Sequence, residues 1–249
     1  MSILLSDQAP KLDLPEDKTL AFASLSYRLS PHPDHPQKPA TTPKSSLRIA
    51  RHPDHIDDVC SGLETLHDHH HLTEYNYILI GHCCGATLAF QALKRYHENA
   101  ASALPRPMAV VGMAGIYHLP DLLENHKNSS YADVYGSFLK GAFGEDALIW
   151  RQASPACWPD HHLDARKIYA GRTVLLVVAD GDDLVEPQQR EKMRLSILGG
   201  SRSTDKDDCI YSEMSVPGGH DEMWLNGERV ITVIERVLQV LSNNDDIHP

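Results

Sequence analysis

The 249-residue sequence lacks the features that mark membrane, secreted and nucleic-acid-binding proteins. No run approaches the roughly 18 apolar residues that a membrane-spanning helix needs. The first residues contain neither a basic segment nor a long apolar one, so no secretory signal is predicted. Lys and Arg number 23 against 34 Asp and Glu, and this net charge of -11 argues against nucleic acid or an anionic membrane as a partner. We therefore expect a cytoplasmic protein that acts on a small molecule.

Motifs for cofactors, metals and disulfides are also missing. The sequence has no G-x-G-x-x-G after its first predicted strand and no P-loop, so no cofactor is predicted. Five cysteines without C-x-x-C spacing indicate reduced thiols and not a disulfide framework. The histidine-rich run 67–71 falls at the end of a predicted helix, without a compact set of carboxylates or thiolates around it. We accordingly predict no metal site there.

The pattern of apolar residues predicts alternating strands and helices in one domain, residues 1–249. Predicted strands cover 20–29, 75–80, 108–116, 173–180 and 210–216. Predicted helices cover 54–71, 87–97, 187–197 and 229–242, and a small helical cap region at about 119–160 includes short helices at 119–125 and 130–143. Such alternation is typical of an α/β fold whose mostly parallel sheet is covered on both faces. A loop at 31–46 contains five prolines, which exclude a helix or a central strand.

The first indication of chemistry is the segment Gly81-His82-Cys83-Cys84-Gly85, which lies between a predicted strand and a predicted helix. It matches the nucleophile elbow G-x-S-x-G of the α/β-hydrolase fold, with Cys83 in the serine position. In such a turn the middle side chain points into the site, and the next backbone N–H, here that of Cys84, faces a developing oxyanion. The adjoining helix N-terminus favours negative charge, so we expect the pKa of the Cys83 thiol to be lowered. Cys84 is interpreted as a structural neighbour of the nucleophile.

An acid and then a histidine should follow the nucleophile along the chain. Asp182 lies in the loop after a late predicted strand, where an acid can orient an imidazole; Asp183 and Asp180 are the alternatives. His220, in the segment Pro-Gly-Gly-His-Asp, follows the last predicted strand and precedes the closing helix. We predict that Cys83, His220 and Asp182 form a catalytic triad in which His220 is the general base.

Around these residues the sequence resembles fungal kynurenine formamidases, the arylformamidase branch of the α/β-hydrolase fold. The matching segments are SYRLSPHPDHP (26–36), RHPDHIDDV (51–59), ILIGHCCGATLAFQAL (78–93), AGIYHLPDLLE (114–124), the loop around Asp182 (hereafter the acid loop) and GGHDEMWLNG (218–227). The resemblance implies that Cys83 stands at the position of the family's nucleophilic serine, Asp182 at its acid and His220 at its base. It also implies hydrolysis of N-formyl-L-kynurenine to formate and kynurenine.

The sequence departs from that family in two respects. The nucleophile position holds cysteine, so the covalent intermediate would be a thioester instead of an ester. The family's His-Gly-Gly-x-Trp motif, whose loop supplies further oxyanion N–H groups, has no counterpart, because the first 20 residues contain no glycine. We expect an N-terminally shortened fold in which residues 1–20 or the loop 31–46 supply a substitute donor, or else a weak hydrolase. An open sheet edge in such a fold favours a homodimer.

These observations leave three functions open. The first is a kynurenine-formamidase-like hydrolase that cleaves an aryl formamide, ester or thioester. The second is an acyl transferase or cyclase of a specialised biosynthetic pathway, which would pass the acyl group to an amine, alcohol or carbanion. The third is a catalytically silent relative that binds a ligand or partner. Candidate residues for lining the substrate pocket are Tyr117, His118, Tyr131, Tyr135 and Trp158.

Overall fold

The computed structural model describes residues 20–70, 77–99, 106–161, 165–199, 209–225 and 227–245 of the chain. Four strands form one sheet in the order in which they occur along the chain, and every neighbouring pair is parallel. They are β1 (Ile78–His82), β2 (Ala109–Met113), β3 (Thr173–Ala179) and β4 (Ile210–Val216). The predicted parallel sheet is therefore confirmed, while residues 75 and 76 of one predicted strand lie outside the described residues.

Helices occupy the connections between the strands and follow the last strand. Those that flank the sheet are α1 (Asp54–His70), α2 (Cys84–Glu98), α6 (Ala165–Tyr169), α7 (Pro187–Leu198), α8 (Glu222–Leu225) and α9 (Glu228–Asp245). The helices predicted at 54–71, 87–97, 187–197 and 229–242 are all present, although residue 71 lies outside the described residues. Helix α7 shows typical end signals, because it begins with a proline and ends at Gly199 in the left-handed conformation.

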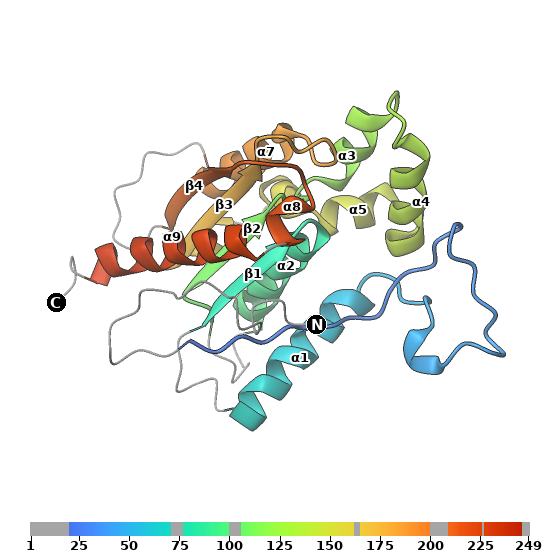
Figure 1. Cartoon of the computed structure of the whole chain (residues 1–249), viewed down its shortest axis with the longest axis horizontal. Coiled ribbons are helices and arrows are strands. Elements are labelled where there is room, and N and C mark those ends of the chain that lie inside the picture. The colour runs from blue at the N-terminus through green and yellow to red at the C-terminus, as the bar shows by residue number, and fades with distance from the viewer. Residues whose placement is uncertain are drawn as a thin grey trace.

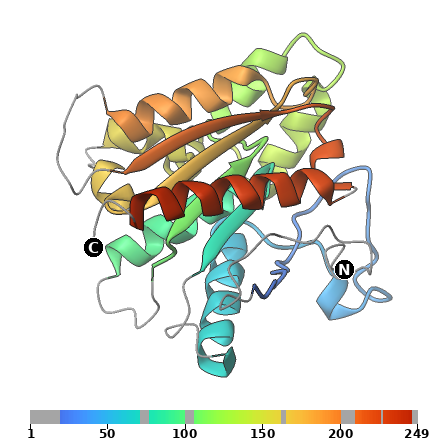
Figure 2. The same ribbon diagram turned by 60° about the vertical axis from the view of Figure 1, so that its left-hand side comes forward.

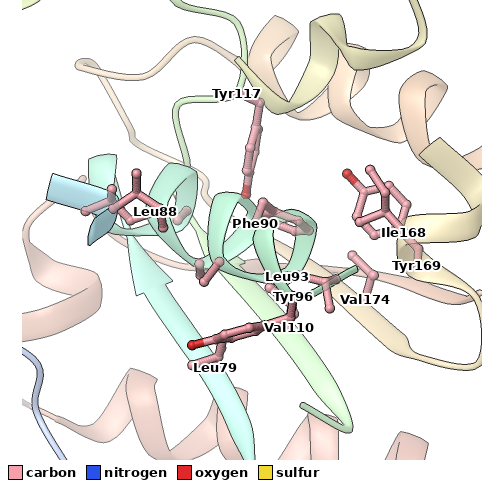
Figure 3. Close-up of a cluster of buried hydrophobic side chains, with 14 of the residues drawn as sticks. Leu79, Leu88, Phe90, Leu93, Tyr96, Val110, Tyr117, Ile168, Tyr169 and Val174 are labelled. Carbon is pink, nitrogen blue, oxygen red and sulfur yellow. The ribbon is translucent and has the colours of Figure 1, made fainter. Parts of the chain in front are cut away.

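Each face of the sheet has its own apolar core, as the helices on both sides show (Figures 1 and 2). On one face, side chains of α1, α2, α6 and α7 pack against strand residues such as Leu79 and Val110. Figure 3 shows this core, in which the rings of Phe90 and Tyr117 meet edge to face with centroids 5.6 Å apart. On the opposite face α9 crosses the strands and packs its apolar stripe against residues such as Leu175. The predicted α/β architecture with two covered faces is confirmed.

A third group of helices forms a cap over one end of the sheet (Figure 1). The cap consists of α3 (Leu119–His126), α4 (Ala132–Phe143), α5 (Ala147–Ala153) and the 3-10 helix η4 (Pro155–His161). Its apolar cluster includes Leu122 and Leu139, and Cys83, which directly follows β1, packs against that cluster. The cap therefore covers the carboxyl ends of the strands, where ligand sites of parallel sheets are found.

The prediction of a strand at 20–29 is wrong. The segment is extended but belongs to no strand, and most of its side chains are exposed. It is attached to α1 instead, because the backbone N–H and the guanidinium of Arg28 both donate to Asp58 at 2.9 Å. The apolar composition of the segment gives it β propensity, but a strand also needs a neighbour that pairs with its backbone. No strand in the described part of the chain pairs with it.

Residues 31–46 form the predicted loop, which contains turns and the short 3-10 helix η2 (Lys44–Ser46). The Gln37 side chain closes the base of the loop by donating to the Ser46 carbonyl at 2.8 Å and accepting the Arg48 N–H at 2.7 Å. The predictions that concern residues 1–19 fall outside the described residues. Among the helices described, none is both long and apolar enough to cross a membrane.

Candidate active site

Cys83 occupies a strained turn between β1 and α2. Its backbone has φ 54° and ψ -122°, values that residues with a side chain rarely adopt. The Cys83 N–H donates to the Met113 carbonyl at 2.9 Å, and the Cys83 carbonyl accepts the N–H groups of Ala86 at 3.1 Å and Ile116 at 3.3 Å. Strain of this kind costs about 1–3 kcal/mol and persists only where the surrounding structure holds it in place. The predicted strand, sharp turn and helix are all present.

The two glycines of the elbow have different roles. A Cβ atom on Gly81 would lie 2.2 Å from the carbonyl oxygen of Gly85, so only glycine allows the strand and the helix to approach this closely. A Cβ atom on Gly85 would meet nothing within 4 Å. The sharp turn at Cys83 therefore requires the first glycine, and the second is not required for steric reasons.

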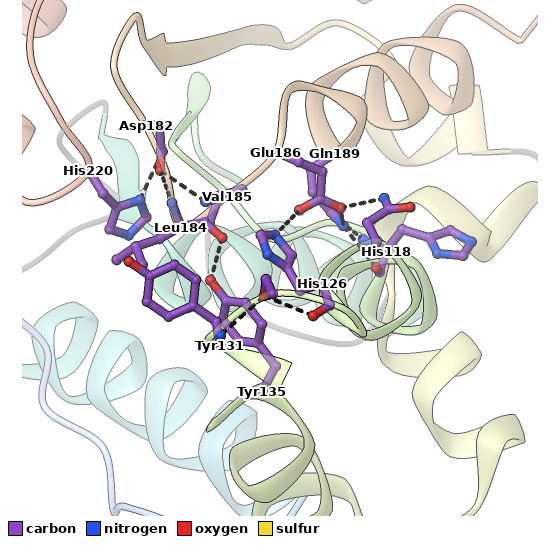
Figure 4. A network of polar contacts seen from close by, with 12 residues as sticks. His118, His126, Tyr131, Tyr135, Asp182, Leu184, Val185, Glu186, Gln189 and His220 are labelled. Carbon is purple, nitrogen blue, oxygen red and sulfur yellow. Dashed lines mark hydrogen bonds and ion pairs between the residues drawn. The ribbon is translucent and has the colours of Figure 1, made fainter. Parts of the chain in front are cut away.

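Asp182 and His220 form a buried pair at the carboxyl ends of the strands (Figure 4). Asp182 follows β3 and His220 follows β4, just as Cys83 follows β1. His220 Nδ1 lies 2.9 Å from Asp182 Oδ2, and only 5% and 7% of the two side chains are exposed. The other carboxylate oxygen accepts the N–H groups of Leu184 at 3.0 Å and Val185 at 2.9 Å. Burial alone would raise the pKa of Asp182, but the hydrogen bonds, that of His220 above all, outweigh it and lower the pKa.

The two alternative carboxylates face other partners. Asp183 accepts a hydrogen bond from the Tyr131 hydroxyl of the cap at 3.2 Å. Asp180 accepts one from the Ser215 hydroxyl on β4. Asp182 is thus the carboxylate of this loop that is hydrogen-bonded to the His220 ring.

The two adjacent thiols differ in pKa, and the direction for Cys83 contradicts the expectation. Hydrogen bonding with Cys84, followed by burial, raises the pKa of the half-buried Cys83 thiol well above its ordinary value. The pKa of Cys84 is lowered to about 6, because hydrogen bonds from Cys83, from the Tyr27 hydroxyl and from backbone N–H groups outweigh the loss of solvation at the thiol. Cys84 is the first residue of α2 and Cys83 precedes it, so the helix N-terminus stabilises a thiolate at Cys84.

His82, inside the elbow, contacts the loop that carries His220. The His82 Nε2–H donates to the backbone carbonyl of His220 at 3.1 Å, and the two ring centroids lie 4.5 Å apart. Burial, and next the proximity of His220, lower the pKa of His82, so its ring is neutral at pH 7. This contact joins the loop that carries His220 to the elbow, at the residue directly before Cys83.

Besides the contact of Tyr131 with Asp183, further polar contacts tie the cap to the acid loop (Figure 4). The Tyr135 hydroxyl of α4 donates to the Leu184 carbonyl. His126 of α3 lies with its Nε2 3.2 Å from the Glu186 carboxylate, and both side chains are largely buried. The acid loop is therefore fixed by contacts with the cap as well as by its connection to β3.

Gln189 of α7 joins the same network from inside the protein (Figure 4). Only 1% of this residue is exposed. Its side-chain oxygen accepts the N–H groups of Tyr117 at 2.8 Å and His118 at 2.7 Å. Its side-chain amide donates to the His118 carbonyl at 3.1 Å and to the Glu186 carboxylate at 2.9 Å. Gln189 thus joins the segment after β2 to the acid loop.

The candidate pocket residues separate into two groups. Tyr117 and Trp158 are buried in the core beneath the cap, and His118 caps α3 by accepting the Asp121 N–H. Tyr135 belongs to the cap cluster against which Cys83 packs, and Tyr131 packs against the same cluster. Burial, and next the proximity of Cys83, raise the pKa of Tyr135, which is therefore the member of the set that lies toward the thiol.

A cavity of about 310 Å³ lies behind the acid loop. Its lining includes Asp182, Val185 and Gln189, while neither Cys83 nor His220 is among its described lining residues. The cavity is therefore not the place where a substrate would meet the thiol.

Metal binding has no support in the described ranges, where no three His, Cys, Asp or Glu side chains gather in a way that could hold an ion. Of the histidine-rich run, His71 lies outside the described residues.

Comparison with known proteins relates this site to a family. The chain is 34% identical over 224 residues to kynurenine formamidase-like hydrolase fscH of Fusarium equiseti, covering 89% of this chain and 71% of that protein. The chain belongs to the kynurenine formamidase-like hydrolases. It is also 28% identical over 222 residues to kynurenine formamidase avaC of Aspergillus versicolor, covering 84% of this chain and 72% of that protein. No protein-family model matches the chain.

Solved structures place this kynurenine formamidase-like hydrolase in the α/β-hydrolase fold. Carboxyl esterase 2 of Tuber melanosporum matches with a TM-score of 0.54 at 17% identity, covering 74% of this chain. An esterase of the archaeon Pyrobaculum calidifontis matches with a TM-score of 0.55 at 14% identity, covering 87% of this chain. The chain spans 61% and 65% of the lengths of these two esterases. At such low identity the matches show the fold alone.

Two residues near the elbow of this kynurenine formamidase-like hydrolase were not predicted from the sequence. His82 occupies the variable position of the G-x-S-x-G pattern, so the pattern itself gives it no role. Tyr27 contacts Cys84 although 57 positions separate them along the chain. The resemblance of the segment SYRLSP to kynurenine formamidases was the only signal that pointed to the region of Tyr27.

Proposed function

We propose that the protein is a cysteine hydrolase that cleaves aryl formamides, with N-formyl-L-kynurenine as the first substrate to test. The observation that carries this proposal is the buried pair of Asp182 and His220, whose loop contacts the elbow in which Cys83 has a strained backbone. The relatives named kynurenine formamidase add support for the substrate class.

The reaction would proceed through a thioester. The Cys83 sulfur attacks the formyl carbon while His220 takes the thiol proton, and the electron pair of the C=O bond moves onto oxygen. The carbonyl then re-forms, the C–N bond breaks, and the proton on His220 passes to the leaving arylamine. A water molecule, deprotonated by His220, next attacks the thioester carbon, and the C–S bond breaks as the tetrahedral intermediate collapses. The proton on His220 passes to the Cys83 sulfur, and formic acid leaves and ionises to formate. Asp182 holds the His220 ring in one orientation throughout.

The raised pKa of Cys83 determines the role of His220 in this scheme. A thiol that stays protonated at neutral pH cannot act as a preformed thiolate. It needs a base within reach during the attack, as a serine does. His220, held by the ionised Asp182, is that base.

An aryl substrate fits the side chains around the thiol. Cys83 packs against the cap cluster that contains Tyr135, and Tyr131 and Phe138 pack against the same cluster. The rings of Tyr135 and Phe138 already meet edge to face, with centroids 5.7 Å apart. Aromatic side chains favour aromatic partners in offset or edge-to-face geometry, and such pairs add about 0.5–1.5 kcal/mol to the burial of apolar surface.

Steady-state kinetics would test the proposal. N-formyl-L-kynurenine, an aryl acetate ester and an aryl thioester would be compared at pH 7.5 with the wild type, Cys83→Ala and Cys209→Ala. We expect Cys83→Ala to lower kcat by at least about 10³-fold and Cys209→Ala to leave it unchanged, since Cys209 directly precedes β4, at the opposite end of that strand from the His220 loop. Equal turnover by the wild type and Cys83→Ala would contradict the proposal.

The thiol in the nucleophile position also favours a second function, acyl transfer. A thioester reacts readily with amines, so an added amine or alcohol could replace water as the acceptor. If the wild type forms the acyl-enzyme but releases formate slowly, and adding an acceptor speeds its release, a transferase or cyclase would replace the hydrolase.

A further inference from the structure

The proposed attack on a formyl carbon creates a negatively charged oxygen that needs hydrogen-bond donors. The Cys84 N–H is one donor, because it belongs to the residue after the nucleophile. Oxyanion holes combine two or more donors, and losing one typically lowers kcat by about 10²–10³-fold. A second donor should therefore lie next to Cys84.

The hydroxyl of Tyr27 lies next to the side chain of Cys84. Its oxygen is 3.4 Å from Cys84 Sγ, within hydrogen-bond distance of a sulfur atom. An oxyanion concentrates its charge on a smaller atom than sulfur and accepts a stronger hydrogen bond, so the Tyr27 hydroxyl can exchange the Cys84 sulfur for a charged oxygen. The Tyr27 hydroxyl can therefore donate to a ligand bound at the elbow.

Tyr27 is held in position by α1. Its ring meets the ring of His55 edge to face, with centroids 6.2 Å apart, and His55 Nε2 lies 2.7 Å from the Ser30 hydroxyl. The next residue, Arg28, forms several hydrogen bonds with the carboxylate of Asp58. These contacts fix the segment before any ligand binds, and a donor fixed in advance stabilises developing charge without reorganisation during the reaction.

The protonation state of Tyr27 suits a donor. Burial, and next the charge on Cys84, raise the pKa of the Tyr27 hydroxyl above its ordinary value. The hydroxyl therefore keeps its proton throughout the neutral and mildly alkaline range.

We propose that the Tyr27 hydroxyl is the second oxyanion donor, together with the Cys84 N–H, for a carbonyl under attack by Cys83. This inference rests on the proposed hydrolase function. As the C–S bond forms, the electron pair of the C=O bond moves onto oxygen, and Tyr27 donates a hydrogen bond to that oxygen without transferring its proton. This hydrogen bond from Tyr27 is lost when the carbonyl re-forms and the C–N bond breaks.

The test compares Tyr27→Phe with the wild type. This change keeps the ring against His55 and removes only the hydroxyl, and Tyr211→Phe on β4 is the matched control. We expect Tyr27→Phe to lower kcat for N-formyl-L-kynurenine by about 10²–10³-fold with little change in KM. Its affinity for an aldehyde inhibitor, whose adduct with Cys83 carries the same oxygen, should fall by a similar factor. Tyr211→Phe should change neither.

A Cys84→Ala background distinguishes the oxyanion from the thiol as the partner of Tyr27. If Tyr27 acts on the oxyanion, Tyr27→Phe lowers kcat by the same factor with or without the Cys84 thiol. If the decrease appears only when the thiol is present, Tyr27 acts through Cys84 and the inference is wrong. Unchanged kcat in Tyr27→Phe, with normal acylation of Cys83 in the wild type, overturns the inference alone. No acylation in the wild type overturns the hydrolase proposal with it.

A second variant keeps the test valid if Tyr27→Phe does not fold. Replacing Tyr27 by 3,5-difluorotyrosine keeps the hydroxyl but lowers its pKa. We expect activity to fall at a lower alkaline pH than in the wild type, because an ionised phenol cannot donate. An unchanged pH profile would contradict the inference.

Discussion

Asp182 reaches His220 with one carboxylate oxygen and its own loop with the other. Its Oδ2 lies 2.9 Å from His220 Nδ1, while its Oδ1 accepts two backbone N–H groups of the loop that carries it. The loop thus fixes the carboxylate, and the carboxylate fixes the imidazole. A side chain with both oxygens occupied in this way can hold only one orientation.

Asp182→Asn should therefore lower kcat by about 10³–10⁴-fold, because an amide can hold His220 in the wrong tautomer. Asp183→Asn, one residue away and paired with Tyr131, is the control and should lower kcat by less than about tenfold. Steady-state turnover of N-formyl-L-kynurenine measures both. Equal losses in the two variants would show that the loop, and not the carboxylate of Asp182, matters.

The same carboxylate predicts a pH dependence of stability. The pKa of Asp182 is lowered in the folded protein. Its stabilising effect is therefore complete above the unfolded pKa of about 3.9 and is lost as the pH falls through the folded value. In urea unfolding, the wild type should exceed Asp182→Asn in free energy of unfolding at pH 7, and this difference should shrink below about pH 4. A difference that stays constant down to pH 3 would contradict the assignment.

The elbow glycines give a matched pair of variants. Gly81→Ala would place a Cβ atom 2.2 Å from the Gly85 carbonyl, so we expect a loss of several kcal/mol in stability or failure to fold. Gly85→Ala meets no atom within 4 Å inside helix α2, and should be neutral or stabilising by up to about 1 kcal/mol. Thermal melting distinguishes them, and similar melting temperatures would contradict the close approach of Gly81 to the Gly85 carbonyl.

Thiol labelling should report the unequal pKa values of the adjacent cysteines. Cys84 is exposed and has a pKa lowered to about 6, whereas the pKa of Cys83 is raised. Iodoacetamide at pH 7, followed by peptide mapping, should therefore modify Cys84 before Cys83. The labelling rate of Cys84 should reach half its maximum near pH 6. Faster labelling of Cys83 would reverse this assignment.

We expect replacement of Gln189 to change the stability of the fold. Gln189→Ala would leave the N–H groups of Tyr117 and His118 without their buried partner, and an unsatisfied buried group costs about 1–3 kcal/mol. We expect a loss of roughly 2–4 kcal/mol in urea unfolding. Gln188→Ala, the exposed neighbour on the same helix, should change stability by less than about 0.5 kcal/mol. Equal stability of the two variants would remove Gln189 from the network.

Much of the fold followed from local patterns in the sequence. The strand predicted at 173–180 is a continuous apolar run, and the closing helix has apolar residues at helical spacing. Both elements lie close to their predicted bounds. The segment 20–29 has the composition of a strand but lacks a partner strand among the described residues, and composition carries no information about pairing.

The site was predictable in its residue types but not in its details. Three aspartates stand close together after β3, and only the three-dimensional path of the loop turns Asp182 toward His220. The direction of the Cys83 pKa depends on its hydrogen bonding with Cys84 and on its burial, neither of which can be read from the sequence. The approach of Tyr27 to Cys84 depends on the packing of α1, for which no local sequence signal exists.

The central claim is that Cys83 carries the acyl group, and mass spectrometry of the intact protein tests it most directly. The wild type would be mixed with N-formyl-L-kynurenine, quenched in acid within milliseconds to seconds, and digested for peptide mapping. We predict an adduct with the mass of one formyl group on Cys83 that decays as formate appears, and no adduct in Cys83→Ala. An adduct on Cys84, or formate release by Cys83→Ala at the wild-type rate, would contradict the account.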